Sequence, residues 1–274
     1  MIEGPLDRLP FHHDRKAEGG IRLGKLQQGR VVDKPFITVI TVVLNDAKGL
    51  EKTISSVKSQ NFPLVEHIII DGGSSDNTLS VLKSHSAFLN YWVSEPDNGI
   101  YDAMNKGLML ASGDIIGILN AGDTYDTDAL SIIARYAVTY IDTQFIFGTV
   151  IKGKLRSNFH PWKIHWSFNF YTCHSVGFFI RRQAQYQLGP YSLAYRCSAD
   201  YDLFFRMLIK HKMKGIATKP SEVIGRFALG GYSDRLNYLD HLVEETRIRL
   251  DNGQSRWLVL SIFILRYLRN IRRI

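Results

Sequence analysis

The sequence predicts an α/β fold in which a mostly parallel central sheet is flanked by helices. Residues 36–44 and 67–70 are apolar and rich in β-branched side chains, as in strands buried on both faces. Between them, Leu50, Ile54 and Val57 recur at the spacing of one helix face. Strands that alternate with helices in this way favour βαβ units, whose strands run parallel.

The alternation continues to about residue 140. We expect the second strand to end at Asp71, and later strands at 91–94 and 114–119. Helical patterns cover 77–84, 101–111 and 127–140. These elements would form the first half of a central domain, residues 36–140.

After residue 141 the pattern becomes less regular. We expect one or two strands over 145–155 with a turn at Gly153, a strand over 176–181 and an amphipathic helix over 199–210. The central domain would therefore extend to residue 235, with 141–235 as its second half. Residues 1–35 would be a loosely ordered N-terminal extension, and 236–274 would form C-terminal helices.

Composition places the chain among ordinary globular proteins. Of its 274 residues, 45% are hydrophobic and 22% are charged. Its two cysteines, Cys173 and Cys197, lack CxxC spacing, which argues against a zinc cluster or a disulfide framework and favours a reduced, cytosolic compartment. Residues 1–34 lack the apolar core of a signal peptide.

The net charge of +8 is compatible with nucleic acid, an anionic membrane or phosphorylated substrates as partners. Five arginines and no acid lie between Arg256 and Ile274, around the apolar nine-residue stretch 257–265. That stretch is too short to span a bilayer, but a helix of this kind suits a membrane interface. The alternative is a terminal helix that docks on the domain through its apolar face. We expect peripheral membrane contact through this tail.

Polar side chains follow three of the expected strands. Asn45, Asp71 and Asp123 fall at carboxyl ends of strands, where open α/β sheets bind ligands. Asp71 could accept hydrogen bonds from a ribose or base, or simply close its turn. Asp123 could hold Mg²⁺ or Mn²⁺, which prefer oxygen ligands and bridge phosphates, or could serve the N-terminus of the next helix.

Several common sites are absent from the sequence. No GxGxxG follows the first strand, which argues against a dinucleotide site. No GxxxxGK[ST] and no GxSxG occur, which argues against a P-loop kinase and a hydrolase elbow. A hydroxyl-activating base would instead come from Asp200, at the start of the 199–210 helix, with Asp202 as its rival.

Six segments follow one another in order along the chain: TVVLN (41–45), IDGGSSDNT (70–78), EPDNGIYDAMNKG (95–107), LNAGD (119–123), ADYDL (199–203) and GGYS (230–233). In this order and spacing they resemble family 2 glycosyltransferases, inverting enzymes of the GT-A fold. The resemblance covers about residues 36–233 and is nearest to bacterial enzymes of exopolysaccharide, colanic acid and O-antigen synthesis. It implies that residues 36–140 form the nucleotide-sugar half of the domain and 141–235 its acceptor half.

The resemblance implies a role for each matching residue at the donor end. Asp71 would contact the base or ribose of the donor nucleotide, usually uridine. Thr41, Val43 and Asn45 would line the same pocket. Asp102 and Asn105 would brace the donor side of the site.

The resemblance also assigns the reacting end. Asp123 would hold the divalent cation, Mn²⁺ or Mg²⁺, and Asp200 would be the general base. His174 falls where this branch has a histidine near the acceptor, or it is a buried structural histidine.

The sequence departs from the family pattern at several positions. Asn120 and Gly122 stand where the metal motif has Asp-x-Asp, and Ala199 replaces the Glu before the base. Gly72 replaces the second Asp of Asp-Asp-Gly-Ser. The Gln-x-x-Arg-Trp signature of processive enzymes is missing, which favours the addition of a single sugar.

The predicted function is therefore inverting transfer of a sugar from a nucleotide-diphosphate donor to a glycan or lipid-linked hydroxyl in cell-surface polysaccharide synthesis. The resemblance implies that the donor is a UDP-sugar. The enzyme would be cytoplasmic and peripheral at the inner face of the plasma membrane. One alternative is a nucleotidyltransferase, although no Gly-rich, Lys-containing loop follows the first strand. Another is a non-catalytic protein that binds an anionic polymer. Nucleic acid is not the expected partner, because the aromatic segment 159–171 carries only Lys163 as a cation.

Overall fold

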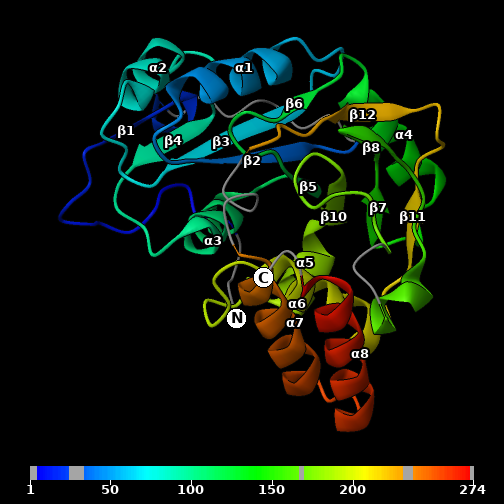
Figure 1. The fold of residues 1–274 in the computed structure, drawn as a ribbon. Helices are drawn as coiled ribbons and strands as arrows, with labels where there is room; N and C mark the ends of the chain where they lie inside the picture. The colour runs from blue at the N-terminus through cyan, green and yellow to red at the C-terminus, as the bar shows by residue number, and fades with distance from the viewer. Residues whose placement is uncertain (1–4, 25–33, 167–169, 231–236, 272–274) are drawn as a thin grey trace.

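The computed structural model describes residues 5–24, 34–166, 170–230 and 237–271. Within these residues, eight strands form the central sheet (Figure 1). In spatial order they are β1 (Ala17–Gly19), β4 (Tyr91–Ser94), β3 (Val65–Asp71), β2 (Ile37–Val43), β5 (Ile115–Ile118), β10 (Phe178–Arg181), β7 (Phe145–Phe147) and β11 (Gly215–Ala217).

The sheet is parallel where the sequence alternates most regularly. Strands β4, β3, β2 and β5 run parallel to one another, which confirms the predicted α/β core. Strand β10 runs antiparallel to both β5 and β7, so the sheet as a whole is mixed. The carboxyl ends of β2, β3 and β5 consequently meet at one edge.

A smaller sheet continues from the second half of the chain. Its order is β6 (Thr124–Tyr125), β12 (Val223–Arg226), β8 (Thr149–Lys152) and β9 (Lys154–Arg156). The expected turn between β8 and β9 is present, and Gly153 adopts a φ of +67° there, a conformation that glycine tolerates without steric cost.

Helices cover both faces of the central sheet (Figure 1). Val39 and Val43 of β2 face the layer of α1 (Ala47–Lys58), α2 (Thr78–Ser84) and α4 (Ala129–Thr139). Ile40 and Val42 face the layer of α3 (Ile100–Leu110) and α5 (Arg182–Leu188). Because successive strand side chains point to opposite faces, the continuous apolar run supplies both layers.

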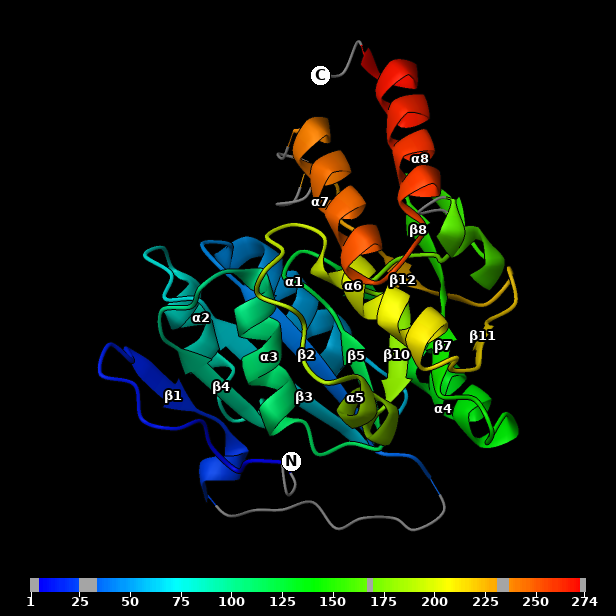
Figure 2. The same cartoon turned by 90° about the horizontal axis from the view of Figure 1, so that it is seen from below.

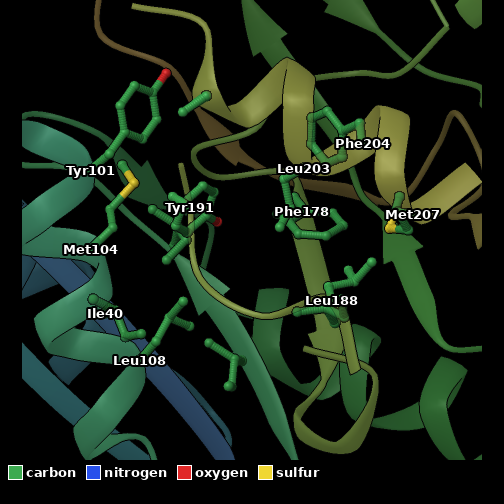
Figure 3. Packing of buried hydrophobic residues seen from close by; sticks show 14 of the residues in the cluster. Ile40, Tyr101, Met104, Leu108, Phe178, Leu188, Tyr191, Leu203, Phe204 and Met207 are labelled. Carbon is green, nitrogen blue, oxygen red and sulfur yellow. The ribbon is translucent and has the colours of Figure 1, made fainter. Parts of the chain in front are cut away.

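One hydrophobic cluster joins the two halves of the chain (Figure 3). Tyr101 and Met104 of α3 share it with Phe178 of β10, and with Leu203 and Phe204 of α6 (Ala199–Phe205). A π-helix, Arg206–Lys210, follows α6, so the helix expected over 199–210 forms in two parts. This packing fixes α6, and with it the start of the 199–210 segment, against α3.

The N-terminal extension was expected to be loosely ordered, and that expectation is wrong for its described part. Strand β1 pairs antiparallel with β4 at the edge of the sheet, and a 3-10 turn, Ile21–Gly24, follows it. Arg15 forms ion pairs with Glu18 and with the buried Glu95. This segment is attached to the domain by backbone pairing and by buried ion pairs. Neither kind of contact produces a periodic pattern of apolar residues in the sequence.

The chain closes with two paired helices, α7 (Tyr238–Asp251) and α8 (Arg256–Arg269), which project from the domain beside α6 (Figure 2). Val259 and Ile262 of α8 are buried, whereas five of its large apolar side chains are exposed: Trp257, Leu260, Ile264, Leu265 and Leu268. Among the described residues, we find no helix with the length and apolar character needed to cross a bilayer. Residues 231–236, which include most of the GGYS segment, lie outside the described residues.

Candidate active site

A cavity of about 230 Å³ lies between α3, α6 and hairpin β8–β9. Two of the predicted site residues, Asp200 and His174, line it. The other lining residues come from several parts of the chain: Ile100, Tyr101, Met104, Asn120, Lys152, Arg156, Tyr171, Thr172, Cys173, Ser175, Cys197 and Phe227. The first and second halves of the domain therefore both contribute walls.

Asp200 is held in this cavity through one of its two carboxylate oxygens. The hydroxyl of Tyr101 donates to Oδ1 at 3.1 Å, and the backbone N–H of Tyr201 donates to the same oxygen at 2.9 Å. Among the described residues, no hydrogen bond reaches Oδ2. A carboxylate fixed in this way can accept a proton from a hydroxyl that enters the cavity.

Asp202, the rival acid, is engaged elsewhere. It is buried, its Oδ2 accepts from Arg206 Nε at 2.8 Å, and its Oδ1 accepts from Asn252 Nδ2 at 2.9 Å. It does not line the cavity. The geometry therefore favours Asp200 as a base and gives Asp202 the structural role of joining α6 to α7.

Helix α7 also fixes the segment that precedes Asp200, a contact that sequence reasoning missed. Glu244 accepts hydrogen bonds from the backbone N–H groups of Arg196 and Cys197, the latter at 2.9 Å. Burial opposes the charge of Glu244, yet these bonds and the Cys197 thiol leave its pKa below the usual value. Glu244 and Arg196 are 48 positions apart in the chain, so no local sequence pattern predicts their contact.

His174 belongs to a buried network beside the base. Its Nε2 lies 2.8 Å from the Tyr191 hydroxyl, and burial lowers its pKa, which favours the neutral imidazole. Asn105 holds Tyr191 through both backbone groups, donating to its oxygen at 2.9 Å and accepting from its N–H at 2.8 Å. Asn105 thus anchors the segment before α6 to α3, and it does not line the cavity.

Asp123 lies next to the cavity rather than in its wall. It is only 3% exposed; Oδ1 accepts from the Ala228 N–H at 2.7 Å, and Oδ2 accepts from the Ser175 hydroxyl. Burial raises its pKa to about 6, against the hydrogen bonds and the charge of Lys152. Asn120 does line the cavity, and its buried Oδ1 has no hydrogen-bond partner among the described residues.

The donor chemistry of these two residues fits a divalent cation, because an amide oxygen and a carboxylate are both hard oxygen donors. The Asn120 oxygen has no hydrogen-bond partner among the described residues, whereas both Asp123 oxygens already accept hydrogen bonds. Mg²⁺ sites in particular need only one or two protein oxygens when a substrate supplies phosphates. Among the described residues, the one geometric cluster of three metal-ligating side chains is His12, His13 and Asp14, in the N-terminal segment.

The loops after β2 and β3 form a second polar cluster. Asp71 is fully buried; it accepts from the Ser74 N–H at 3.2 Å and from the Ser94 hydroxyl at 2.6 Å. Asn45 has a positive φ of 52°, and its Oδ1 accepts from the Ser75 N–H at 2.8 Å. Both side chains therefore hold the 72–75 loop in shape, with Asp71 directed inward.

The remaining donor-side predictions are placed at the margin of this cluster or in the core. Thr41 is fully buried, with Oγ1 2.9 Å from His67 Nε2. The Val43 carbonyl accepts from the Gly72 N–H at 3.0 Å. Asp102 accepts from the Asn98 N–H at 2.9 Å at the start of α3. The structure does not bring these side chains to the cavity of Asp200.

The departure at Gly72 has a spatial explanation. A Cβ added at residue 72 would lie 2.3 Å from Oδ2 of Asp97, which comes from the loop before α3. Asp97 therefore occupies the space into which a longer side chain at 72 would extend. Burial raises the pKa of Asp97, and the nearby Asp102 and Asp71 charges act in the same direction.

The two clusters adjoin through Gly122. Gly122 has a φ of +91°, and a Cβ there would lie 3.4 Å from the Ala228 Cβ and 3.6 Å from Asp46 Oδ2. Asp46 follows Asn45, while Ala228 binds Asp123, which in turn binds Ser175 in the cavity wall. Gly122 thus lies between the loop after β2 and the hydrogen bonds that join Ala228, Asp123 and Ser175 beside the cavity.

Residues 38–204 match the family model described as glycosyl transferase family 2, which is more than half of the chain. The chain belongs to glycosyl transferase family 2. The resemblance read from the six sequence segments is thereby confirmed.

Relatives of known sequence carry the same assignment. An uncharacterized glycosyltransferase of Mycobacterium tuberculosis is 45% identical over 92 residues, which span 33% of this chain and 35% of that protein. A PGL/p-HBAD biosynthesis glycosyltransferase of the same species is 32% identical over 181 residues, 63% of this chain and 69% of that protein.

Solved structures share the fold at low sequence identity. TarS of S. aureus, in complex with UDP-GlcNAc, has a TM-score of 0.63 and 13% identity, and the match covers 85% of this chain and 73% of that one. Glucosyl-3-phosphoglycerate synthase of M. tuberculosis, with Mn²⁺ and UDP-glucose, has a TM-score of 0.59 and 15% identity over 81% and 80%. The predicted GT-A fold is confirmed.

Proposed function

We propose that this family 2 member transfers a sugar, with inversion, from a nucleotide-diphosphate donor, a UDP-sugar, to a hydroxyl of an acceptor. The observation that carries the proposal is Asp200, whose Oδ1 is held by Tyr101 and Tyr201 while Oδ2 is without a partner among the described residues. A base so oriented in a cavity suits the activation of a hydroxyl.

The reaction is a single displacement at the anomeric carbon. Oδ2 of Asp200 accepts the proton of the acceptor hydroxyl as its oxygen forms the new glycosidic bond. The bond from the anomeric carbon to the diphosphate breaks at the opposite side of the sugar, and the nucleoside diphosphate carries away the electron pair. His174, held neutral by burial and bonded to Tyr191, would orient the acceptor beside the base.

The nucleotide is assigned to the loops after β2 and β3. Asn45 and Asp71 shape the 72–75 loop, and Asp97 fills the space beside Gly72. The loop backbone and Asp97 would then contact the base or ribose, with Asp71 acting through the loop. Thr41, Val43 and Asp102 would support this region without touching the donor, whereas Asn105 would act by holding the Tyr191 segment against α3.

A divalent cation, Mn²⁺ or Mg²⁺, is assigned to Asn120 and Asp123. When bound, such a cation neutralises charge that develops on a departing diphosphate. The presence of Mn²⁺ in the glucosyl-3-phosphoglycerate synthase structure supports this assignment at the level of the fold.

The acceptor is assigned to a glycan or lipid-linked sugar of cell-surface polysaccharide synthesis, at the cytoplasmic face of the membrane. Helix α8 supports a peripheral membrane contact, because Trp257 is 80% and Leu265 68% exposed beside the tail arginines. Flotation with anionic vesicles tests this contact. The W257S/L265S variant should remain at the bottom of the gradient, because it no longer binds the vesicles. The I141S variant, which removes an equally exposed apolar side chain elsewhere, should float with the vesicles like the unaltered protein.

The function itself is tested with a panel of nucleotide sugars in the presence of Mn²⁺. The true donor should raise the melting temperature, because a ligand that binds only the folded state stabilises it. Release of nucleoside diphosphate with an acceptor supports sugar transfer, whereas release of pyrophosphate would support a nucleotidyltransferase. Salt-sensitive binding of an anionic polymer without any sugar turnover would contradict the proposal.

A further inference from the structure

Hairpin β8–β9 brings two cations to the cavity that holds Asp200. Lys152 is the last residue of β8 and Arg156 the last of β9, and both line the cavity. Arg156 pairs with Val150, two residues before Lys152, so the two cations lie on the same face of the hairpin. Neither residue belongs to a segment that carries the family resemblance.

These cations have no acidic partner in the part of the chain that the structure describes. Ion pairs there engage many other basic residues, such as Arg15 and Lys106, but no carboxylate lies within 4.0 Å of the Lys152 or Arg156 nitrogens. Lys152 instead lies over the Phe227 ring, with Nζ 3.9 Å from its centroid. Both side chains are half-buried, so part of their hydration has been removed without a direct ion pair in return; Lys152 acts on Asp123 only from beyond ion-pair distance.

A second observation points to a ligand in the same place. Thr172 lines the cavity and is 8% exposed, and its buried hydroxyl has no hydrogen-bond partner among the described residues. Buried polar groups in native proteins are almost always hydrogen-bonded, so an unpartnered hydroxyl in a cavity wall calls for a ligand or a water. A hydroxyl can donate to a phosphate oxygen.

We propose that Lys152, Arg156 and the Thr172 hydroxyl form a phosphate-binding subsite beside the base. The guanidinium of Arg156 offers a planar fork that matches phosphate, and Lys152 adds a compact charge. The proposal rests on the function assigned above and adds a further set of binding residues to it. The phosphate belongs either to the diphosphate of the donor or to a phosphate that links the acceptor to its lipid.

The subsite gives the departures in the metal motif a physical consequence. With Asn120 and Gly122 in place of two acids, the chain offers a cation a single carboxylate, Asp123. Two fixed positive charges in the same cavity neutralise phosphate independently of any metal. Phosphate binding should therefore persist, through Lys152 and Arg156, in the absence of divalent cations.

Isothermal titration calorimetry with inorganic pyrophosphate in EDTA tests the subsite. K152M and R156M should each weaken pyrophosphate binding about tenfold or more, as expected for the loss of a charge-assisted hydrogen bond. K154M is the matched control, because Lys154 lies on the same hairpin and is exposed but does not line the cavity. K154M should bind pyrophosphate like the unaltered protein. All variants should have the melting temperature of the unaltered protein.

Several results would overturn the subsite. They are undiminished pyrophosphate binding by K152M and R156M, an equal loss in K154M, or no binding of pyrophosphate by the unaltered protein. T172V adds a variant that leaves the charges intact and should weaken binding by a smaller factor. Pyrophosphate binding needs no sugar transfer, so the subsite can stand even if nucleotide sugars are not substrates.

Parallel titrations with UDP and uridine distinguish the two sources of phosphate. If K152M and R156M weaken UDP and pyrophosphate alike and leave uridine unchanged, the subsite holds the donor diphosphate. If they weaken pyrophosphate and leave UDP unchanged, it holds the acceptor phosphate. Either result supports the subsite and assigns its ligand.

Discussion

The two polar clusters of this domain differ in how their hydrogen bonds are used. In the loop after β3, Asp71 is fully buried and its two oxygens accept bonds from Ser74 and Ser94. In the cavity beside α6, Asp200 keeps one oxygen without a partner, and Thr172 has an unpartnered hydroxyl, within the described residues. In the first cluster both Asp71 oxygens accept hydrogen bonds from the protein itself. In the second cluster an Asp200 oxygen and the Thr172 hydroxyl can still form hydrogen bonds with a ligand.

This difference separates positioning from chemistry. A side chain whose hydrogen bonds are all internal shapes the backbone around it, and its replacement should act through stability and ligand affinity. A side chain with spare capacity in a cavity can meet a substrate, and its replacement should act on turnover. The predictions below separate these two readouts, from the largest expected effect to the smallest.

D200N should lower kcat about 10²–10⁴-fold, the usual contribution of a general base. Asparagine keeps an oxygen for Tyr101 and Tyr201, so folding should be retained. D202N is the control: it should lower stability by about 1–3 kcal/mol through the bonds to Arg206 and Asn252 and leave kcat of the folded enzyme nearly unchanged. Normal turnover by folded D200N would show that Asp200 is not the general base.

D71N should mainly weaken donor binding and stability. The asparagine at position 71 has a single side-chain oxygen, which cannot accept hydrogen bonds from both the Ser74 N–H and the Ser94 hydroxyl. The free energy of unfolding should therefore fall by about 1–3 kcal/mol. The expected readouts are a lower urea midpoint and a KM for the donor raised about tenfold or more, with kcat less affected. A large fall in kcat at unchanged KM would mean that Asp71 reaches the reacting atoms.

The strand that ends at Asp71 should also respond to acid through His67. Burial lowers the pKa of His67 to about 3, whereas an unfolded histidine titrates near 6.5. Below pH 6.5 the unfolded state therefore binds the extra proton, and the stability present above that pH is lost as pH falls toward 3. At pH 5 the loss is about 2 kcal/mol.

Urea unfolding at pH 7 and pH 5 measures this effect, with H67Q as the comparison. The variant removes the titrating ring, so the difference between it and the unaltered protein should shrink at pH 5. If both proteins lose equal stability between the two pH values, His67 is not the group responsible.

The smallest effect is expected at the N-terminal segment. Lys16 Nζ donates to the carbonyl oxygens of Gly73 at 2.7 Å and Ser74 at 2.8 Å, so it supports the loop that Asp71 shapes. The contact is exposed, and K16M should raise the donor KM only about twofold to fivefold, with kcat unchanged. H13Q, a change elsewhere in the same segment, should leave donor KM unaltered.

The sequence came closest where the signal is local. Strands β2 to β5 and helices α1 to α4 follow from apolar runs and helical periodicity, and the GT-A fold followed from ordered motifs. Strand β1 was missed because Ala17–Gly19 pairs with β4 through its backbone and has no apolar alternation. The antiparallel direction of β10 was also beyond a local pattern, since it depends on how the chain returns to the sheet.

The sequence by itself determined the family, the order of strands and helices in the first half, and a list of acids at strand and helix ends. Only the tertiary structure decided that Asp200 lies in the cavity while Asp202 is paired, that Asp71 faces inward, and that Lys152 and Arg156 enter the same cavity as the base. The reason is physical: periodicity arises from neighbours in the chain, whereas burial, hydrogen-bond partners and net charge in a cavity arise from residues far apart in sequence.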